Sequence, residues 1–311
     1  MTGIEWTDEV WNPVTGCEKV SAGCASCYAE RMFRRLASNP STPQYHGRRF
    51  TDVRCHEERL GLPFQWKRPR RIFVNSMSDL FHEAVPDEFI HKVFAVMCAC
   101  PRHTFIVLTK RSRRMAEFSR AHMTCQERQI AVGIVSQIGA FDRNAADIPR
   151  EWIVDGVWRL PNLWLLVSVE DQPSAEARVP DLIETNASVL GVSYEPALGP
   201  VDLSPWLAGL HWVICGGESG PRARPMDMRW ARSARDQCVA AGVPFFFKQW
   251  GEWGPDYYLP NEAPDNVRRV TLRGGTMVLE GKKRAGRTLD GREWNEYPAL
   301  KANHDRPDLH T

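Results

Sequence analysis

Six short apolar segments recur along the chain, and each ends abruptly in polar residues. Within a segment the apolar residues are consecutive rather than alternating, which is typical of strands that are buried on both faces. A seventh segment, near residues 5–12, precedes them and has the length of a strand. The six segments cover residues 71–79, 104–110, 163–171, 188–195, 211–218 and 243–249. The pattern therefore predicts about seven strands.

Helical patterns separate most of these strands. Residues 86–99 begin with a proline and two acids, which the first turn of a helix favours, and residues 229–241 end at Gly242, a common helix C-cap. Strand spacings of roughly thirty to sixty residues fit βα units and a parallel sheet. We therefore expect an α/β fold, which leaves a doubly wound sheet and a (β/α) barrel as alternatives.

The ends of the predicted strands favour the barrel. A charged residue stands at or just past the carboxyl end of six consecutive strands: Asp79, Lys110, Glu170, Glu195, Glu218 and Lys248. In a barrel these ends meet at one mouth, where barrel enzymes have their active sites. We therefore predict a partial or complete (β/α) barrel of about seven parallel strands, with these side chains around one cavity.

The barrel is expected to occupy residues 1–250, with a helical insertion near 120–160. A C-terminal extension over residues 251–311 has a different composition, rich in aromatic and turn residues. Within it, residues 267–281 predict a β-hairpin around Gly274-Gly275, and a basic turn follows at 282–287.

Composition excludes several classes of protein. The chain has 311 residues with 40 Lys and Arg against 38 Asp and Glu, so it is neither a histone-like basic protein nor an acidic disordered one. No apolar run approaches the ~18–20 residues that cross a bilayer, and the N-terminus lacks the pattern of a signal peptide. We expect a soluble cytoplasmic protein without a membrane partner; nothing in the sequence indicates its oligomeric state.

Basic residues gather in four stretches despite the balanced net charge. They lie at residues 48–49, 67–71, 110–114 and 282–287. Clustered Lys and Arg suit contact with the phosphates of DNA, RNA or a nucleotide. Solvated surface is the alternative interpretation.

Three of the nine cysteines stand close together. Cys17, Cys24 and Cys27 have the spacing C-x6-C-x2-C, in a glycine-containing loop between the first strand and a helix. Three thiolates on one loop suit a metal ion or an iron–sulfur cluster. A structural zinc ion would need a fourth ligand, for which His46, Cys55 and His56 are available but stand in no paired motif. Three cysteine ligands alone would leave one iron of a four-iron cluster without a protein ligand. The other six cysteines are expected to be structural.

This loop, with Cys-x2-Cys-Tyr at its end, resembles the radical S-adenosylmethionine (SAM) superfamily. The usual spacing there is C-x3-C-x2-C, so this chain has three more residues in the first gap. The whole chain is similar to a phage-associated family of unknown function with a three-cysteine motif. That resemblance rests on Trp11-Asn-Pro, on Gly-Cys17 to Tyr28-Ala, and on the segments 76–81, 193–196, 216–220, 246–251 and 286–291.

The resemblance implies a cofactor and a set of residues that hold it. In the superfamily three cysteines hold three irons of a [4Fe–4S] cluster, and the fourth iron binds SAM, whose cleavage gives a 5′-deoxyadenosyl radical. Zinc is the alternative metal. The metal ligands would be Cys17, Cys24 and Cys27, and the residues expected to bind the cofactor are Tyr28, Ser78, Asp79, Glu170, Gly216, Gly217 and Glu218. Glu195 and Lys248 are a candidate catalytic acid–base pair at the mouth.

Two functions from different classes follow. The first is an enzyme of the radical SAM type that modifies or repairs a substrate, with a nucleotide or nucleic acid as the candidate. It would take electrons from a reductant protein such as a flavodoxin or ferredoxin. The second is a non-catalytic nucleic-acid-binding protein with a structural zinc or iron–sulfur site.

Overall fold

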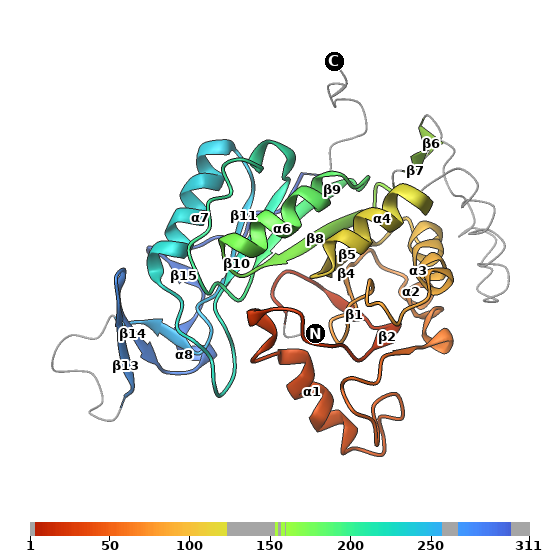
Figure 1. The fold of residues 1–311 in the computed structure, drawn as a ribbon, viewed down its shortest axis with the longest axis horizontal. Helices are drawn as coiled ribbons and strands as arrows, with labels where there is room; N and C mark the ends of the chain where they lie inside the picture. Colours follow the sequence, from red (N-terminus) through yellow and green to blue (C-terminus); the bar gives the residue numbers. More distant parts are fainter. Residues whose placement is uncertain (1–3, 123–152, 155–156, 159, 257–266, 300–311) are drawn as a thin grey trace.

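Seven parallel strands form the centre of the fold. The chain is seen in a computed structural model, which describes residues 4–122, 153–154, 157–158, 160–256 and 267–299 (Figure 1). The strands lie side by side in chain order, as β1-β4-β5-β8-β9-β10-β11. Their bounds are β1 Glu9–Trp11, β4 Arg71–Val74, β5 Thr104–Thr109, β8 Leu163–Val169, β9 Val189–Tyr194, β10 Trp212–Gly216 and β11 Phe245–Gln249. All seven predicted strands are confirmed.

The strand order decides between the two expected architectures. In a doubly wound sheet the order of the strands reverses part-way. Here every strand of the sheet pairs with the next strand of the sheet along the chain. The sheet curls into a half-barrel, and within the described ranges β1 and β11 do not pair with each other. The prediction of a partial barrel is therefore confirmed.

Alternate residues of each strand face opposite sides of the sheet. In β8, Leu165 and Val167 belong to the large core beneath the helices, whereas Trp164 and Leu166 belong to a second core on the inner face. Both faces are buried, which explains why the strands are continuous apolar runs. Residues from outside the barrel strands complete the inner core: Trp6 and Tyr297 both pack against Trp212.

Helices cover the outer face of the sheet (Figure 1). The predicted helices α3 and α7 are confirmed, as is the helix expected after the cysteine loop, α1, and α7 ends at Gly242 in the left-handed conformation. The α-helices are α1 Tyr28–Ala37, α2 Leu62–Gln65, α3 Asp87–Ala99, α4 Ser112–His122, α6 Gln172–Ile183, α7 Met228–Ala241 and α8 Lys282–Ala285. Single 3-10 turns are η1 Ala22–Cys24, η2 Glu57–Arg59 and η4 Leu207–Gly209.

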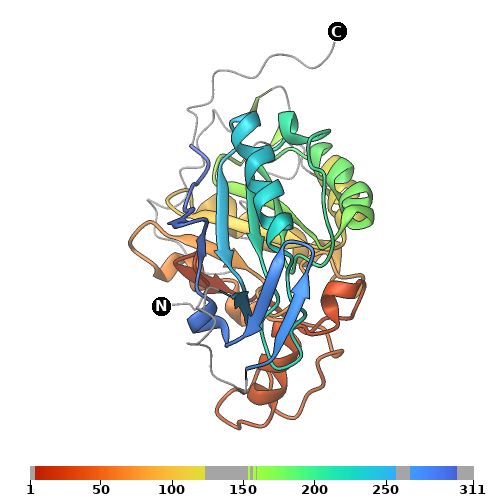
Figure 2. The ribbon, with the colours of Figure 1, turned by 90° about the vertical axis from the view of Figure 1, so that its left-hand side faces the viewer.

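Short antiparallel pairs flank the barrel. They are β2 Val14–Thr15 with β3 Arg54–Cys55, β6 Ile153–Val154 with β7 Val157–Trp158, and β15 Thr288–Leu289 with β16 Arg292–Glu293. A three-stranded sheet contains β12 Trp253–Pro255, β13 Arg269–Leu272 and β14 Gly275–Leu279. Figures 1 and 2 show α1 and the β13–β14 hairpin in the lower half of the molecule in both views.

The C-terminal predictions hold with one correction. The hairpin forms, but Leu272 pairs with Gly275, so its turn is Arg273-Gly274, one residue earlier than predicted. The basic turn begins as the one-turn helix α8. Most of the insertion expected near 120–160 lies outside the described residues, and the division into barrel and extension remains a prediction. Among the helices that the structure describes, none is long and apolar enough to span a membrane.

Candidate active site

A cavity of about 600 Å³ lies at the carboxyl ends of the barrel strands. This volume is typical of small-molecule sites. Most of the predicted site residues line it: Cys17, Cys24, Cys27, Tyr28, Ser78, Asp79, Glu195, Gly217, Glu218 and Lys248. Glu170 and Gly216 are not among the lining residues. Trp6, Phe73 and Leu108, which belong to the inner core, form an apolar part of the wall.

Strand alternation brings the charged residues to this cavity. In β11 the inward position after Phe246 is Lys248, and after β9 the inward position is Glu195. The pairing of β10 with β11 skips Lys248, because Cys215 faces Phe247 and Gly216 faces Gln249. Such a bulge redirects a side chain, and here it places Lys248 beside Glu195.

Glu195 and Lys248 form an ion pair on the cavity wall. The Lys248 Nζ lies 2.7 Å and 2.9 Å from the two Glu195 carboxylate oxygens. The Gln249 amide donates to Glu195 Oε1 at 3.3 Å and to Ser219 Oγ at 2.9 Å. The two residues predicted as an acid–base pair are therefore in direct contact.

The cysteine loop lies between β1 and α1, as the sequence predicted; it begins after the short strand β2 and is fixed at its base. Gly16 has a φ of +94° there, and a Cβ atom on it would lie 2.6 Å from the Asp52 carbonyl oxygen, so only glycine fits. The Cys17 amide donates to the Phe50 carbonyl at 2.8 Å, and Ser78 Oγ donates to the Val14 carbonyl at 2.8 Å.

All three thiols of the loop are free and line the cavity. Burial raises the pKa of Cys17 to about 12, with Asp79 adding to the increase and Arg111 opposing it. Burial also raises the pKa of Cys27, against the effect of the Glu30 and Ala29 amides at the start of α1. Without a bound metal these two groups are neutral thiols, so metal binding there would release protons.

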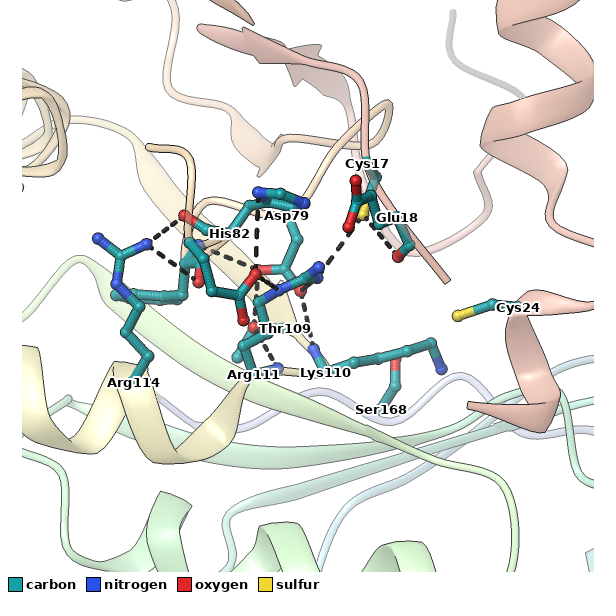
Figure 3. Close-up of polar contacts among 12 residues, drawn as sticks. Cys17, Glu18, Cys24, Asp79, His82, Thr109, Lys110, Arg111, Arg114 and Ser168 are labelled. Carbon is teal, nitrogen blue, oxygen red and sulfur yellow. Dashed lines mark hydrogen bonds and ion pairs between the residues drawn. The ribbon is translucent and has the colours of Figure 1, made fainter. Parts of the chain in front are cut away.

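The donor set suits a cluster better than a single ion. Across the described ranges, no three His, Cys, Asp or Glu side chains converge closely enough to hold one metal ion. A [4Fe–4S] cluster is several ångströms across and takes one thiolate per iron, so its ligands need not converge on a point. Three free thiols around one cavity fit that group, and Figure 3 shows the Cys24 side chain directed toward the side where Cys17 lies.

Arg111 connects the cysteine loop to the end of β5. Its Nη1 atom lies 3.6 Å from Cys17 Sγ and 3.3 Å from Asp79 Oδ2, and its Nε donates to Glu83 at 2.8 Å (Figure 3). Burial opposes its charge, but Asp79 and Glu83 raise the pKa of Arg111 overall. A buried cation is therefore held against the sulfur of a predicted cluster ligand.

Asp79 is already occupied by groups of this chain. Besides Arg111, it accepts hydrogen bonds from Thr109 Oγ1 at 2.7 Å, Phe81 N at 3.0 Å and Lys110 N at 3.0 Å. These contacts use most of the acceptor capacity of its two oxygens. The geometry thus favours a role in holding Arg111 over direct contact with a cofactor.

Glu170, predicted to bind the cofactor, lies behind the cysteine loop instead of lining the cavity. It is 1% exposed and pairs with Lys110 and with Arg178, the latter at 2.9 Å. Its Oε1 accepts from Ser21 Oγ in the cysteine loop at 2.8 Å. Burial alone would raise the pKa of Glu170, but the two cations outweigh it and the pKa is lowered. A Cβ on Gly23 would lie 2.5 Å from this carboxylate, so the loop packs directly on it.

Glu218 also connects to the loop. Its carboxylate binds Arg224 in a bidentate manner, at 2.9 Å from Nε and 2.6 Å from Nη2, and Nη2 donates to the Ala22 carbonyl at 2.9 Å. Nearby, Arg31 of α1 donates to the Ser219 carbonyl at 3.1 Å. The cysteine loop is therefore held by residues that follow β8, the middle strand of the sheet, and β10.

Gly216 and Gly217 allow a close approach of backbone segments. A Cβ on Gly217 would lie 1.9 Å from the Trp250 carbonyl oxygen, so this position excludes any side chain. Gly216 is the last residue of β10, and a Cβ there would lie 3.3 Å from the Glu195 carboxyl carbon. Tyr28, by contrast, is 47% exposed at the cavity.

The basic stretches are mostly engaged in ion pairs. Arg70 pairs with Glu9, Arg71 with Asp8, Arg113 with Glu117, Arg114 with Asp87 and Lys282 with Glu5. Only Lys110, Arg111 and Lys282 of these stretches line the cavity. Residues 67–71 are not among the residues that line it, so that stretch offers no basic side chain to the cavity.

Sequence reasoning missed the residues that hold the site together: Ser21, Arg31, Arg178 and Arg224, and the role of Arg111. Arg111 stood in a basic stretch whose interpretation was polyanion contact. One signal was present for Ser21, which lies between two of the cysteines in a loop that has to be tethered.

The sequence profile of one family, described as "Protein of unknown function (DUF5131)", matches residues 1–298. The chain belongs to this family. No curated protein matches this chain. The expected link to phages stays a prediction.

Among solved structures, this chain is similar to spore photoproduct lyase. The structure of that enzyme complexed with dinucleoside spore photoproduct is 9% identical with a TM-score of 0.37, covering 87% of this chain and 68% of that chain. A mutant with bound AdoMet and dinucleoside spore photoproduct is 10% identical with a TM-score of 0.40, covering 88% and 69%. These TM-scores are too low to assign a role to any residue of this chain.

Proposed function

We propose that this chain is an iron–sulfur enzyme of the radical SAM type. The observation that carries the proposal is the placement of three free thiols from one loop around a single cavity at the carboxyl ends of a parallel half-barrel. This is the end of the sheet at which βα folds position their chemistry. Cys17, Cys24 and Cys27 would hold the cluster.

The residues around the thiols take complementary parts. Asp79 and Glu83 hold Arg111 against Cys17, and Glu170 and Glu218 hold the loop. Tyr28 and the backbone of Gly217 remain at the cavity for contact with SAM. A bound [4Fe–4S] cluster with an open iron would supply the electron that cleaves SAM to methionine and a 5′-deoxyadenosyl radical.

The rest of the cavity would exclude water and manage protons. Trp6, Phe73 and Leu108 make part of the wall apolar, which favours a dry site for reactive species. Elsewhere on the cavity wall, the Lys248 ammonium would give a proton to a substrate. The Glu195 carboxylate, 2.7 Å away, would stabilise the charged form of Lys248. A reductant protein such as a flavodoxin or ferredoxin would reduce the cluster.

Anaerobic purification of the full chain tests this proposal. We expect brown protein with about four irons and four sulfides per chain, and formation of 5′-deoxyadenosine and methionine from SAM after reduction with dithionite. Colourless protein with one zinc per chain and no cleavage of SAM would contradict it. That result would favour the non-catalytic nucleic-acid-binding alternative.

Replacing Arg111 by glutamine should make the reduction potential of the cluster more negative. Reduction adds one negative charge to the cluster, and the buried guanidinium beside Cys17 stabilises that charge. A redox titration followed by electron paramagnetic resonance would measure the shift. Arg111→Lys keeps the charge and should recover part of it.

Arg113→Gln is the matched control for Arg111→Gln, because it removes the same charge only two positions along the chain. The Arg113 side chain is 86% exposed and pairs with Glu117. Its potential should stay close to that of the unmodified protein, since exposed charges are screened by solvent. Equal shifts in Arg111→Gln and Arg113→Gln would show that Arg111 has no special contact with the cluster.

A further inference from the structure

Three side chains that line the cavity carry a buried polar atom without a partner among the residues that the structure describes. They are the Asn75 Nδ2, the Trp6 Nε1 and the Gln249 Oε1 atoms. The residues are only 2%, 2% and 4% exposed, respectively. A buried donor or acceptor without a partner costs about 1–3 kcal/mol, so such groups call for an explanation.

The orientation of both amides is set by their other contacts. Asn75 Oδ1 accepts from the Val14 backbone amide at 3.1 Å, which requires oxygen at that position and leaves the Nδ2 donor unpaired. Gln249 Nε2 donates to the Glu195 carboxylate at 3.3 Å and to Ser219 Oγ at 2.9 Å. Because a carboxylate only accepts, the unpaired atom of Gln249 is the acceptor Oε1.

The unpaired atoms define what a ligand would have to offer. Asn75 and Trp6 need hydrogen-bond acceptors, and Gln249 needs a donor. Trp6 is also part of the apolar wall, where its ring lies 4.8 Å from that of Phe73, between centroids. A flat ring that carries carbonyl or ring-nitrogen acceptors and an N–H donor on its edge satisfies both requirements, because its faces are apolar and its edge is polar.

We propose that Asn75 and Gln249 bind the edge of a nucleobase, which is the substrate group that enters the cavity. The reaction on the bound base rests on the proposed function, but the binding of the base does not. Asn75 follows β4, which is one strand in from the edge strand β1, and Gln249 ends β11, the strand at the other edge. A base between them would lie in the cavity that the three cysteines line. The amides are covered in the free chain, so binding requires the small side-chain adjustments that ligands commonly cause.

Two sources supply this chemistry, a free nucleoside or nucleotide and a base of a nucleic acid. Extending a base into a cavity in this way is what enzymes acting on DNA or RNA bases require. The rim of the cavity does not decide between the sources, because its lysines Lys19 and Lys282 are paired with Glu30 and Glu5. The experiment therefore includes both.

The test is calorimetric titration of the anaerobically purified full chain with thymidine, deoxycytidine, deoxyadenosine and deoxyguanosine, and with single-stranded hexanucleotides of each base. We expect at least one base to bind. Asn75→Asp keeps the size and the acceptor for Val14 but turns the unpaired donor into an acceptor. It should weaken binding of that base by roughly tenfold or more. Tighter binding of the hexanucleotide than of the nucleoside would indicate a nucleic acid, and equal binding a free nucleoside or nucleotide.

Two further variants keep the proposal falsifiable. Gln249→Met has a similar length and removes the acceptor, and it should also weaken binding. Asn295→Asp makes the change of Asn75→Asp at an exposed position that does not line the cavity, and it should leave binding unchanged. Absence of binding by every nucleoside and hexanucleotide, or equal binding by Asn75→Asp and the unmodified chain, would overturn the proposal.

The outcome is separable from that of the proposed function. Base binding needs no cluster, so it can be found in a chain that holds no iron. A brown protein that cleaves SAM but binds no base would reject only the nucleobase site. If Asn75→Asp instead lost SAM binding and kept base binding, Asn75 would belong to the cofactor, and the assignment made here would be wrong.

Discussion

Replacing Cys17, Cys24 or Cys27 by alanine, one at a time, is expected to abolish stable binding of the cluster. Each residue would hold one iron, and a cluster with only two protein ligands exposes a second iron to solvent and to chelators. Iron and sulfide analysis after anaerobic reconstitution should show nearly complete loss in all three variants. Their visible absorption should be lost with the iron.

Buried cysteines elsewhere in the fold provide the control. Cys98 of α3 and Cys238 of α7 are each no more than 1% exposed and lie in the core beneath the helices. Alanine at either position removes a small buried group, so it should lower stability while the iron content is kept. Equal loss of iron in Cys98→Ala and Cys17→Ala would mean that the thiols act only through folding.

The barrel could be predicted because its strands are buried on both faces. All seven residues of β8, for example, are buried, and this produces the continuous apolar runs that the sequence shows. The position of the chemistry followed from the same pattern, since parallel strands bring their carboxyl ends together. Most of the residues predicted for the site therefore line the cavity.

The partners of the acidic residues could not be predicted in the same way. Glu170 and Glu218 both follow a strand, like Glu195, and nothing local distinguishes them. Ser21, which donates to Glu170, lies 149 positions earlier in the chain. Such contacts depend on the curvature of the sheet and on the path of the loop. The sequence pattern predicts on which face of the sheet, and at which end of a strand, a residue lies. It does not predict which side chain the residue contacts there.

Replacing Glu170 should be among the most destabilising changes in the chain. The carboxylate is buried between Lys110 and Arg178, and Glu170→Ala would leave two cations without their counter-charge. Breaking a buried ion pair from one side typically costs about 3–5 kcal/mol. Urea denaturation, monitored by circular dichroism, would measure the decrease in the free energy of unfolding. Glu176→Ala, at an exposed position of α6, should change it by no more than about 0.5 kcal/mol.

The contribution of Glu170 should depend on pH. Because its pKa is lower in the folded chain than the ordinary value, ionised Glu170 stabilises the fold at neutral pH. That stabilisation is lost as the pH falls below about 4 and through the folded pKa. Glu170→Gln resembles the protonated acid, so the difference in unfolding free energy between it and the unmodified chain should narrow in acid. A difference that stayed constant with pH would show that the charge of Glu170 contributes nothing.

Replacing Ser21, the partner of Glu170 in the cysteine loop, separates the effect on the stability of the fold from the effect on the loop. Ser21→Ala removes the hydroxyl that binds Glu170 and leaves the pairs with Lys110 and Arg178 intact. Loss of one hydrogen bond should cost about 0.5–1.5 kcal/mol, much less than Glu170→Ala. The loop would nevertheless lose one of its tethers, so bound iron should pass to a chelator faster than in the unmodified protein. Unchanged iron release in Ser21→Ala would mean that the contacts of Arg224 and Arg31 suffice to hold the loop, and that Glu170 serves the core alone.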